Sequence, residues 1–160
     1  MKVLIIEDDL NKGRQLTSFV QRTLPTSDIR QARSYQSGLE AIFEDTPDLV
    51  LLDMTLPTFD VSPTEAGWRT RPLGGTEILS ELDRMEVKCL AIVVTQFESF
   101  GEGRDFVTLD ELERRLARKY SHLYLGVVSY QPSESSWREE LERLVRVAVK
   151  RHEEELGADK

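Results

Sequence analysis

Carboxylate side chains directly follow two short apolar segments of the sequence. Glu7, Asp8 and Asp9 follow the first segment, and Asp53 follows the second. Two carboxylates about 4 Å apart repel each other by roughly 4 kcal/mol at an effective dielectric constant of about 20, so a cluster of them needs a counter-ion, raised pKa values, or both. An all-oxygen site with room for water suits Mg²⁺. If the two segments lie side by side, their acidic ends therefore predict a magnesium site.

The same acidic residues allow a simpler interpretation, in which they cap a helix and remain in solvent. Acidic residues are common before a helix N-terminus. For Glu7, Asp8 and Asp9 alone, this interpretation carries as much weight as a metal site. Asp53 is harder to explain in this way, because it ends four consecutive apolar residues and precedes Met54-Thr55-Leu56-Pro57. The two strand ends together favour a functional site.

Short apolar segments rich in β-branched residues predict the strands that position these acids. Four of the segments are expected to be buried parallel strands, namely 3–6, 49–52, 90–94 and the weaker 123–130. A fifth segment, 29–32, is more polar and alternates, as an edge strand does.

Apolar residues at helical spacing lie between these segments and predict helices. The stripes are formed by Leu16, Phe19, Val20 and Leu24; by Leu39, Ile42 and Phe43; by Ile78, Leu79, Leu82 and Met85; by 109–116; and by Trp137, Leu141, Leu144, Val145 and Ala148. The pairs Thr108 with Glu111 and Ser136 with Glu139 have the spacing of a capping box. The charged segment 151–160 is expected to fray.

Strand and helix alternate along the chain, which is typical of an α/β fold with an open, doubly wound parallel sheet. Such sheets bind ligands at the carboxyl ends of their strands, where the strand order reverses. Glu7, Asp8 and Asp53 stand at such ends. No internal repeat, low-complexity tract or linker divides the chain, so we expect a single domain.

The composition is that of one acidic domain. The 160 residues are 39% hydrophobic and 31% charged, which fits a single core. The formal net charge of −8 disfavours nucleic-acid binding, which needs a basic surface. The longest apolar run, 89–94, falls far short of the roughly 20 residues of a membrane span. The first residues, MKVLII, turn acidic at once and have neither the longer apolar region nor the cleavage site of a signal peptide, so we expect none. The single cysteine, Cys89, suits a reducing cytoplasm, where we expect the protein.

Four motifs resemble those of response-regulator receiver domains, the CheY-like superfamily. The run 47–57, PDLVLLDMTLP, closely resembles their phosphoacceptor strand, and VLIIEDD at 3–9 resembles their first strand. GGTEIL at 74–79 resembles the Gly-led start of their third helix, and IVVT at 92–95 their fourth strand with its switch hydroxyl. The match is close up to about residue 95 and holds in outline beyond it. The resemblance implies a flavodoxin-like fold with five parallel strands, three α/β/α layers and one domain over 1–150.

The resemblance also implies roles for individual residues. Asp53 would be the nucleophile that accepts a phosphoryl group from a histidine kinase or a small phosphodonor. Asp8 would bind Mg²⁺ directly together with Asp53, Glu7 would bind it through water, and the backbone carbonyl of Thr55 would complete the protein ligands. The metal would neutralise charge on the transferring phosphoryl oxygens. Thr95 would donate a hydrogen bond to the phosphoryl group and couple it to the face of the fourth helix and fifth strand.

Two single positions depart from the family pattern. Gln131 precedes Pro132 where the family has a lysine, so the cation that pairs with the phosphoryl group is missing. Lys119 is the nearest lysine in the sequence but is expected at the opposite end of that strand, and no other residue is expected to replace the cation. Gln96 follows the switch hydroxyl, where the family usually has a small residue. Its side chain could block phosphodonors or could donate to the phosphoryl oxygens.

Two loops are longer than in the family, and both are expected at the edge that holds the acids. They span 58–73 and 96–107, and loops of this length are usually functional or disordered. The first contains Trp68 close to arginines and the second contains phenylalanines. Such residues anchor protein interfaces, but they could equally fold back as lids over the core.

Two functional hypotheses therefore stand side by side. In the first, the chain is a stand-alone receiver of a two-component phosphorelay that is phosphorylated on Asp53 with Mg²⁺. Its output would pass to a protein partner through the 58–73 and 96–107 loops or the last helix, with a homodimer left open. In the second, it is a pseudo-receiver, a binding or adaptor module that phosphorylation does not regulate. Neither hypothesis makes the chain an enzyme beyond self-phosphorylation from a phosphodonor and slow autodephosphorylation.

Overall fold

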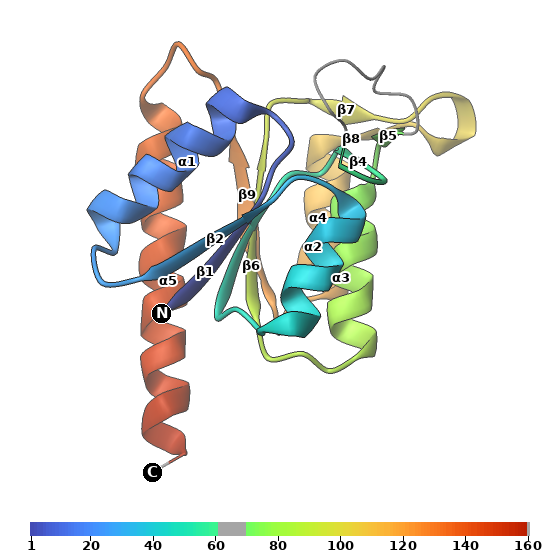
Figure 1. Ribbon diagram of the computed structural model, residues 1–160. Coiled ribbons are helices and arrows are strands. Elements are labelled where there is room, and N and C mark those ends of the chain that lie inside the picture. The colour runs from blue at the N-terminus through green and yellow to red at the C-terminus, as the bar shows by residue number, and fades with distance from the viewer. Residues whose placement is uncertain (61–69, 160) are drawn as a thin grey trace.

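A five-stranded parallel sheet runs through the centre of the molecule (Figure 1). The computed structural model describes residues 1–60 and 70–159 of the chain. The strands of the sheet are β1 (Lys2–Ile6), β2 (Asp28–Ala32), β3 (Leu49–Leu52), β6 (Leu90–Thr95) and β9 (Tyr124–Ser129). Their order is β2-β1-β3-β6-β9, and every pair of neighbours is parallel. The strand order therefore reverses between β1 and β3, the place where such sheets bind ligands.

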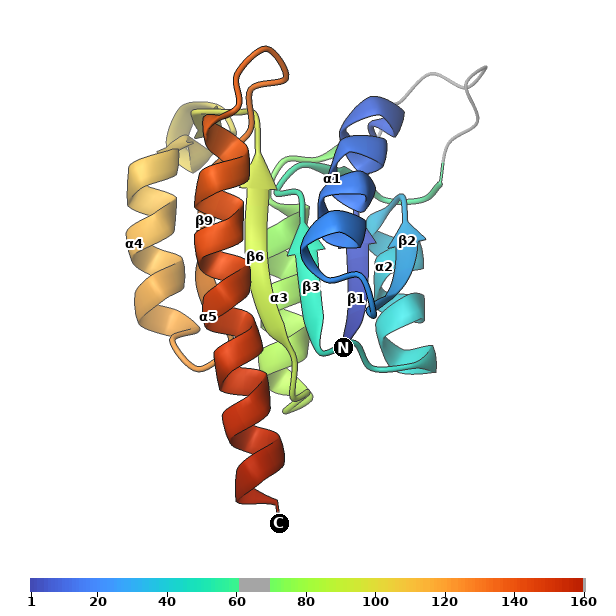
Figure 2. The same cartoon turned by 90° about the vertical axis from the view of Figure 1, so that its left-hand side faces the viewer.

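Helices cover both faces of the sheet and give the molecule three layers (Figure 2). The helices on one face are α1 (Leu10–Thr23) and α5 (Ser136–Ala158). Those on the other face are α2 (Tyr35–Glu44), α3 (Gly74–Arg84) and α4 (Leu109–Lys119). The fold is flavodoxin-like, a single α/β/α domain, which confirms the fold predicted from the sequence.

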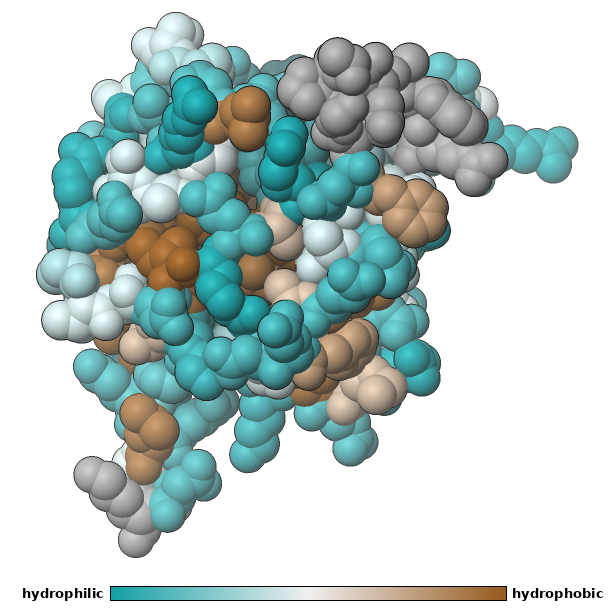
Figure 3. Space-filling model, viewed as in Figure 1, coloured by the Kyte–Doolittle hydropathy of each residue, from teal (hydrophilic) through white to brown (hydrophobic). Residues whose placement is uncertain are grey.

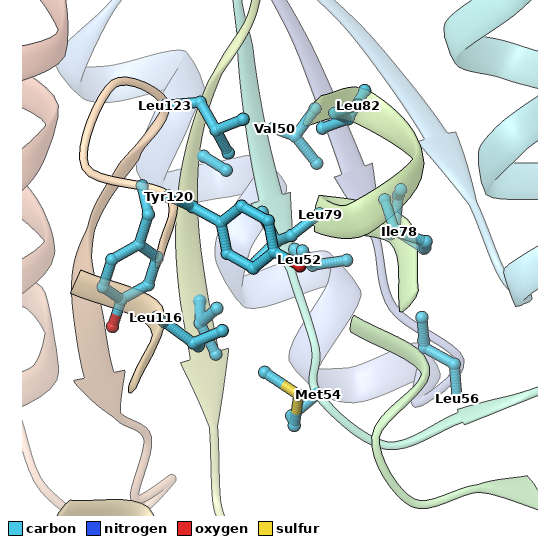
Figure 4. Close-up of a cluster of buried hydrophobic side chains, with 14 of the residues drawn as sticks. Val50, Leu52, Met54, Leu56, Ile78, Leu79, Leu82, Leu116, Tyr120 and Leu123 are labelled. Carbon is cyan, nitrogen blue, oxygen red and sulfur yellow. The ribbon is translucent and has the colours of Figure 1, made fainter. Parts of the chain in front are cut away.

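Each face of the sheet has its own hydrophobic core, because successive side chains of a strand point to opposite faces. Leu4 and Ile6 of β1 pack toward α2, α3 and α4, whereas Val3 and Ile5 pack toward α1 and α5. Figure 4 shows part of the first core, in which side chains from β3 and α3 lie around Tyr120. β3 and β6 are buried along their whole length, and β2 is partly exposed. The edge position predicted for β2 is confirmed.

Two short antiparallel hairpins stand beside the carboxyl edge of the sheet (Figure 1). One pairs β4 (Leu56–Pro57) with β5 (Thr70–Arg71), and the other pairs β7 (Ser99–Phe100) with β8 (Val107–Thr108). A 3₁₀ turn at Gly103–Asp105 lies between β7 and β8. β5 and β7 lie within the two segments predicted to be long loops at this edge, 58–73 and 96–107, whereas β4 precedes the first segment and β8 begins at the end of the second. The sequence did not predict these strands, because two residues are too few to show a period.

The ends of two helices test the predicted caps. Thr108 accepts a hydrogen bond from the Glu111 N–H at 3.3 Å, so the cap predicted for α4 is confirmed. The cap predicted at Ser136 is wrong, because Ser136 is already helical and the preceding Ser135 makes no side-chain capping bond.

The C-terminal segment is helical where fraying was predicted. α5 continues to Ala158 instead of ending near residue 150. His152 Nδ1 lies 3.8 Å from the Asp48 carboxylate at the other end of the sheet, so these turns touch the domain. The residues from 151 to 156 are also mostly good helix formers, which explains why charge alone was a poor predictor of fraying. No helix in the described parts of the chain is long and apolar enough to cross a membrane.

Candidate functional site

The register of the sheet places the predicted acids next to one another. Ile6 of β1 pairs with Leu52 of β3, so the next residues, Glu7 and Asp53, lie on adjacent strands. The Asp53 N–H donates to the carbonyl of Ile6 at 3.0 Å, which continues the ladder to this point. Carboxylate oxygens of Glu7, Asp8 and Asp53 all lie within 4.8 Å of one another. The clustering expected from the strand ends is confirmed.

Of the three acids that follow β1, one caps a helix and another lies buried beside Asp53, so each of the two interpretations holds for part of the run. Asp9 caps α1, because its side chain accepts from the Lys12 N–H at 3.0 Å. Asp8 is exposed. Glu7 is only 6% exposed and Asp53 only 5%. One residue of the run is thus a helix cap, whereas Glu7 faces Asp53 inside the protein.

Lys12 of α1 is the residue that sequence analysis missed. Its side chain is 2% exposed, and its Nζ lies 2.6 Å from Glu7 Oε2 and 3.3 Å from Asp53 Oδ1. Nζ also donates to the carbonyl oxygen of Val94 at 2.7 Å. The signal was present in the sequence, because Lys12 stands four positions before Leu16 and so falls in phase with the apolar stripe of α1. A lysine on the buried face of a helix needs buried partners.

Burial changes the protonation of both buried carboxyl groups. It raises the pKa of Glu7 to about 8, and the nearby Asp53 carboxylate adds to this effect while Lys12 opposes it. Burial also raises the pKa of Asp53, again opposed by Lys12. One ammonium group thus faces two buried carboxyl groups, and the site holds a proton more readily than free carboxylates would. This excess of oxygen ligands over cations, together with the exposed carboxylate of Asp8, fits a hard divalent cation.

The backbone around Asp53 is closely packed. The Met54 N–H donates to Asp53 Oδ1 at 2.8 Å, and the Gly75 N–H donates to the carbonyl oxygen of Met54 at 2.9 Å. A Cβ atom at Gly75 would lie 2.7 Å from the carbonyl oxygen of Asp53. The first turn of α3 can therefore approach the Asp53 turn only with glycine there. Thr55 is held by the bond from its hydroxyl to the carbonyl oxygen of Pro72 at 3.0 Å.

Thr95 ends β6 at the same edge of the sheet. Leu52 pairs with Val93, so Thr95 lies one residue further along its strand than the position opposite Asp53. Its side chain is fully buried, and its hydroxyl oxygen accepts from the Phe97 N–H at 3.2 Å. The hydroxyl is thus attached to the first residues of the segment that leads into β7.

Comparisons with known proteins agree with this arrangement. No family model matches the chain. An uncharacterized protein, y4jR of Sinorhizobium fredii, is 32% identical over 141 residues, which cover 86% of this chain and 92% of that protein. The Detocs response regulatory protein DtcB of Enterobacter cloacae is 29% identical over 143 residues, or 88% of this chain and 95% of DtcB.

Solved receiver structures have the same fold. A signal receiver domain from Vibrio parahaemolyticus has a TM-score of 0.67 at 18% identity, covering 99% of this chain and 97% of that one. A CheY-like receiver domain protein from Methanospirillum hungatei has a TM-score of 0.61 at 18% identity, covering 96% and 97%. The chain is a response-regulator receiver domain. The Mn²⁺-bound form of response regulator Rcp1 is also similar, with a TM-score of 0.55 at 17% identity and coverage of 89% and 90%.

This receiver domain differs from the family pattern at the end of β9. Gln131, which stands where the family lysine was expected, is exposed, and so is Gln96 after β6. Tyr130, the residue before Gln131, is buried, and the centroid of its ring lies 5.7 Å from Lys12 Nζ. The end of β9 therefore contributes an aromatic ring to the site, and the ammonium group comes from α1.

Some aromatic residues of the long loops pack into the core and others are exposed as interface anchors would be, so both interpretations from the sequence apply. Phe100 of β7 is buried in the core, whereas the side chains of Phe59, Phe97 and Phe106 are 59%, 41% and 52% exposed. Figure 3 shows hydrophilic residues over much of the viewed face, with apolar residues exposed between them in several places. Trp68 lies outside the described residues.

Proposed function

We propose that this receiver domain accepts a phosphoryl group on Asp53 with the help of a bound Mg²⁺ ion. The observation that carries the proposal is the convergence of Glu7, Asp8 and Asp53 within 4.8 Å at the carboxyl edge of a receiver sheet. Two of these carboxyl groups are buried, which is costly unless a cation or a proton compensates their charge. A role in accepting a phosphoryl group would explain why the protein retains these two buried carboxyl groups.

The proposed direct ligands of the metal are Asp8, Asp53 and the backbone carbonyl of Thr55, and Glu7 is proposed to bind it through water. When bound, Mg²⁺ neutralises negative charge on the transferring phosphoryl oxygens. The protein itself contributes position, because the Met54 N–H holds Asp53 Oδ1 at 2.8 Å and fixes the rotation of the carboxylate. A fixed nucleophile lowers the entropic part of the barrier.

Thr95 is proposed to report the phosphoryl group to the rest of the molecule. Its hydroxyl now accepts from the Phe97 N–H. If the hydroxyl turns to donate to a phosphoryl oxygen, the Phe97 amide loses its acceptor. Phe97 packs edge-on against Phe100 of β7, with ring centroids 6.4 Å apart. A change at Thr95 would therefore be transmitted to the 96–107 segment.

The proposed partners follow from this arrangement. A histidine kinase or a small acyl phosphate supplies the phosphoryl group, and a downstream protein reads the 96–107 segment, where Phe97 and Phe106 are exposed. The name of the DtcB relative, a response regulatory protein, supports such a signalling role. We place this exchange in the cytoplasm and expect no nucleic-acid partner, given the net charge of −8.

A second candidate function is that of a pseudo-receiver, which binds a partner through the same segment without phosphorylation. The exposed Gln131 at the position of the family lysine favours it. One experiment separates the two: wild-type protein and the Asp53→Asn variant are incubated with Mg²⁺ and acetyl phosphate, and intact masses are measured. We expect one phosphoryl group on the wild type and none on the variant. An unmodified wild type, under conditions that label another receiver, would leave the pseudo-receiver function.

A further inference from the structure

We infer that Lys12 is the cation that pairs with the phosphoryl group in this receiver, in place of the lysine missing from the end of β9. The inference rests on the proposed phosphorylation of Asp53. It concerns a residue on a different element from the one that carries the family lysine. Four observations support it: the contacts of the ammonium group, its place at the sheet edge, the orientation of Asp53 and the contacts of Glu7.

The ammonium group of Lys12 makes one hydrogen bond and two ion pairs. Nζ donates to the carbonyl oxygen of Val94 at 2.7 Å and lies 2.6 Å from Glu7 Oε2 and 3.3 Å from Asp53 Oδ1. With 2% exposure, the ammonium group has exchanged its water for these oxygens. A buried lysine is retained at such a cost only where its partners are held for it. Here two of the partners belong to the acidic site itself.

Lys12 Nζ lies near the middle of the carboxyl edge of the sheet. Lys12 starts on α1, which follows β1, and its Nζ reaches the Val94 carbonyl of β6, two strands away from β1. Val94 in turn pairs with Val128 of β9. The Tyr130 ring at the end of β9 lies 5.7 Å from Nζ, so the ammonium group lies near the strand end that carries the cation in other receivers.

The orientation of Asp53 leaves an oxygen for the reaction. Lys12 Nζ and the Met54 N–H are both placed against Oδ1. We therefore assign Oδ2 as the nucleophile. Its electron pair forms the new P–O bond while the bond from phosphorus to the donor breaks, and the donor's carboxylate oxygen or imidazole nitrogen leaves with that bond's electrons. The ammonium group, 3.3 Å from Oδ1, is then beside the new phosphoryl group and can pair with one of its oxygens.

Glu7 positions Lys12 in this arrangement. Its Oε2 faces Nζ, and its Oε1 accepts from the Asp9 N–H at 3.0 Å. Both oxygens of the carboxyl group thus have protein partners, and the second one ties it to the cap of α1. Glu7 is a positioning residue for the ammonium group as well as a member of the acidic cluster.

The test compares wild-type protein with Lys12→Met, which removes the charge and keeps the length of the side chain. Lys88→Met, at an exposed position, is the matched control. Labelling by acetyl phosphate with Mg²⁺ is followed over time by intact mass. We expect Lys12→Met to be labelled at least about tenfold more slowly, because one charge-stabilising partner of the phosphoryl group is lost. The control should match the wild type. Labelling of Lys12→Met at the wild-type rate would overturn the inference.

A second measurement distinguishes this role from a structural one. Removing a positive charge from a group of carboxylates should strengthen Mg²⁺ binding, so calorimetry without phosphodonor should show a lower Mg²⁺ dissociation constant for Lys12→Met. A merely damaged site would bind Mg²⁺ more weakly, and that result counts against the inference. If Lys12→Met does not fold, the double variant Glu7→Gln/Lys12→Met is measured in its place, because it neutralises both partners of the ion pair at once and leaves no unpaired buried charge between them.

Failure of the proposed function is distinguishable from failure of this inference. If the wild type is not labelled, the proposed function fails, and beryllofluoride with Mg²⁺ then serves as the probe. Binding of beryllofluoride to the wild type but not to Lys12→Met would still assign the phosphoryl-pairing role to Lys12. Equal binding to both proteins, or binding to neither, would overturn that role.

Discussion

Gly75 and Lys12 are the residues whose neighbours determine the shape of the site. Gly75 lets α3 approach the Asp53 turn, and Lys12 places a cation between Glu7 and Asp53. Both roles depend on contacts between residues far apart in the sequence. They are therefore best examined by single substitutions with a matched control elsewhere in the chain.

The first prediction is that Gly75→Ala destabilises the protein. The new Cβ would lie 2.7 Å from the Asp53 carbonyl oxygen and 3.0 Å from Met54 Cα, and neither backbone atom can rotate away. Overpacking of this kind costs about 1–3 kcal/mol, and the shift of the Asp53 turn should also slow phosphorylation. Gly157→Ala is the control, since a Cβ there meets nothing within 4 Å, and it should change the free energy of unfolding by less than about 1 kcal/mol. Equal urea midpoints for the two variants would contradict this account.

At the same scale, the sequence predicted the acids of the site and missed their counter-ion. Glu7 and Asp53 were predictable because each ends an apolar strand, so their positions follow from the parallel register alone. Lys12 was not predicted, because receivers of this family have their cation at the position of Gln131, at the end of another strand. Its phase with Leu16 on α1 was a signal that the sequence contained. A charged residue within an apolar helical stripe should be examined as a partner for predicted buried charges of the opposite sign.

The elements around the site show where local sequence rules hold. Five strands and five helices follow the predicted segments closely, since long buried strands and amphipathic helices carry a clear period. The hairpins β4–β5 and β7–β8 were not predictable, because each strand is held by its partner and not by its own pattern. The C-terminal end of α5 was predicted wrongly from its charge.

The second prediction concerns the caps of α4 and α5. Thr108→Ala removes the oxygen that accepts from the Glu111 N–H, and loss of such a cap costs about 1 kcal/mol. Ser135→Ala should change stability little, because the Ser135 side chain makes no capping bond. The free energies of unfolding of the two variants, measured in urea, give the difference directly. A larger loss for Ser135→Ala than for Thr108→Ala would show that the caps are assigned to the wrong residues.

On the scale of the whole molecule, the site and the 96–107 segment lie at the same edge of the sheet. Thr95 connects them, because its buried hydroxyl accepts from the Phe97 N–H and Phe97 packs on Phe100. If the hydroxyl turns to a phosphoryl group, the amide of Phe97 loses its acceptor and the start of the segment becomes easier to open. The opening of this segment is then the global response that a partner would detect.

Hydrogen exchange tests this response. We expect that adding beryllofluoride and Mg²⁺ speeds exchange of the Phe97 amide and its neighbours up to β8, while α2, which packs against β1 and β2, keeps its protection. Thr95→Val is the matched control, because valine keeps the shape of the side chain but offers no acceptor. In this variant the Phe97 amide should exchange quickly already and respond little to the mimic. If beryllofluoride binds to the wild type and protection of Phe97 stays constant, Thr95 does not carry the signal to this segment, and a route through another element at the edge must be sought.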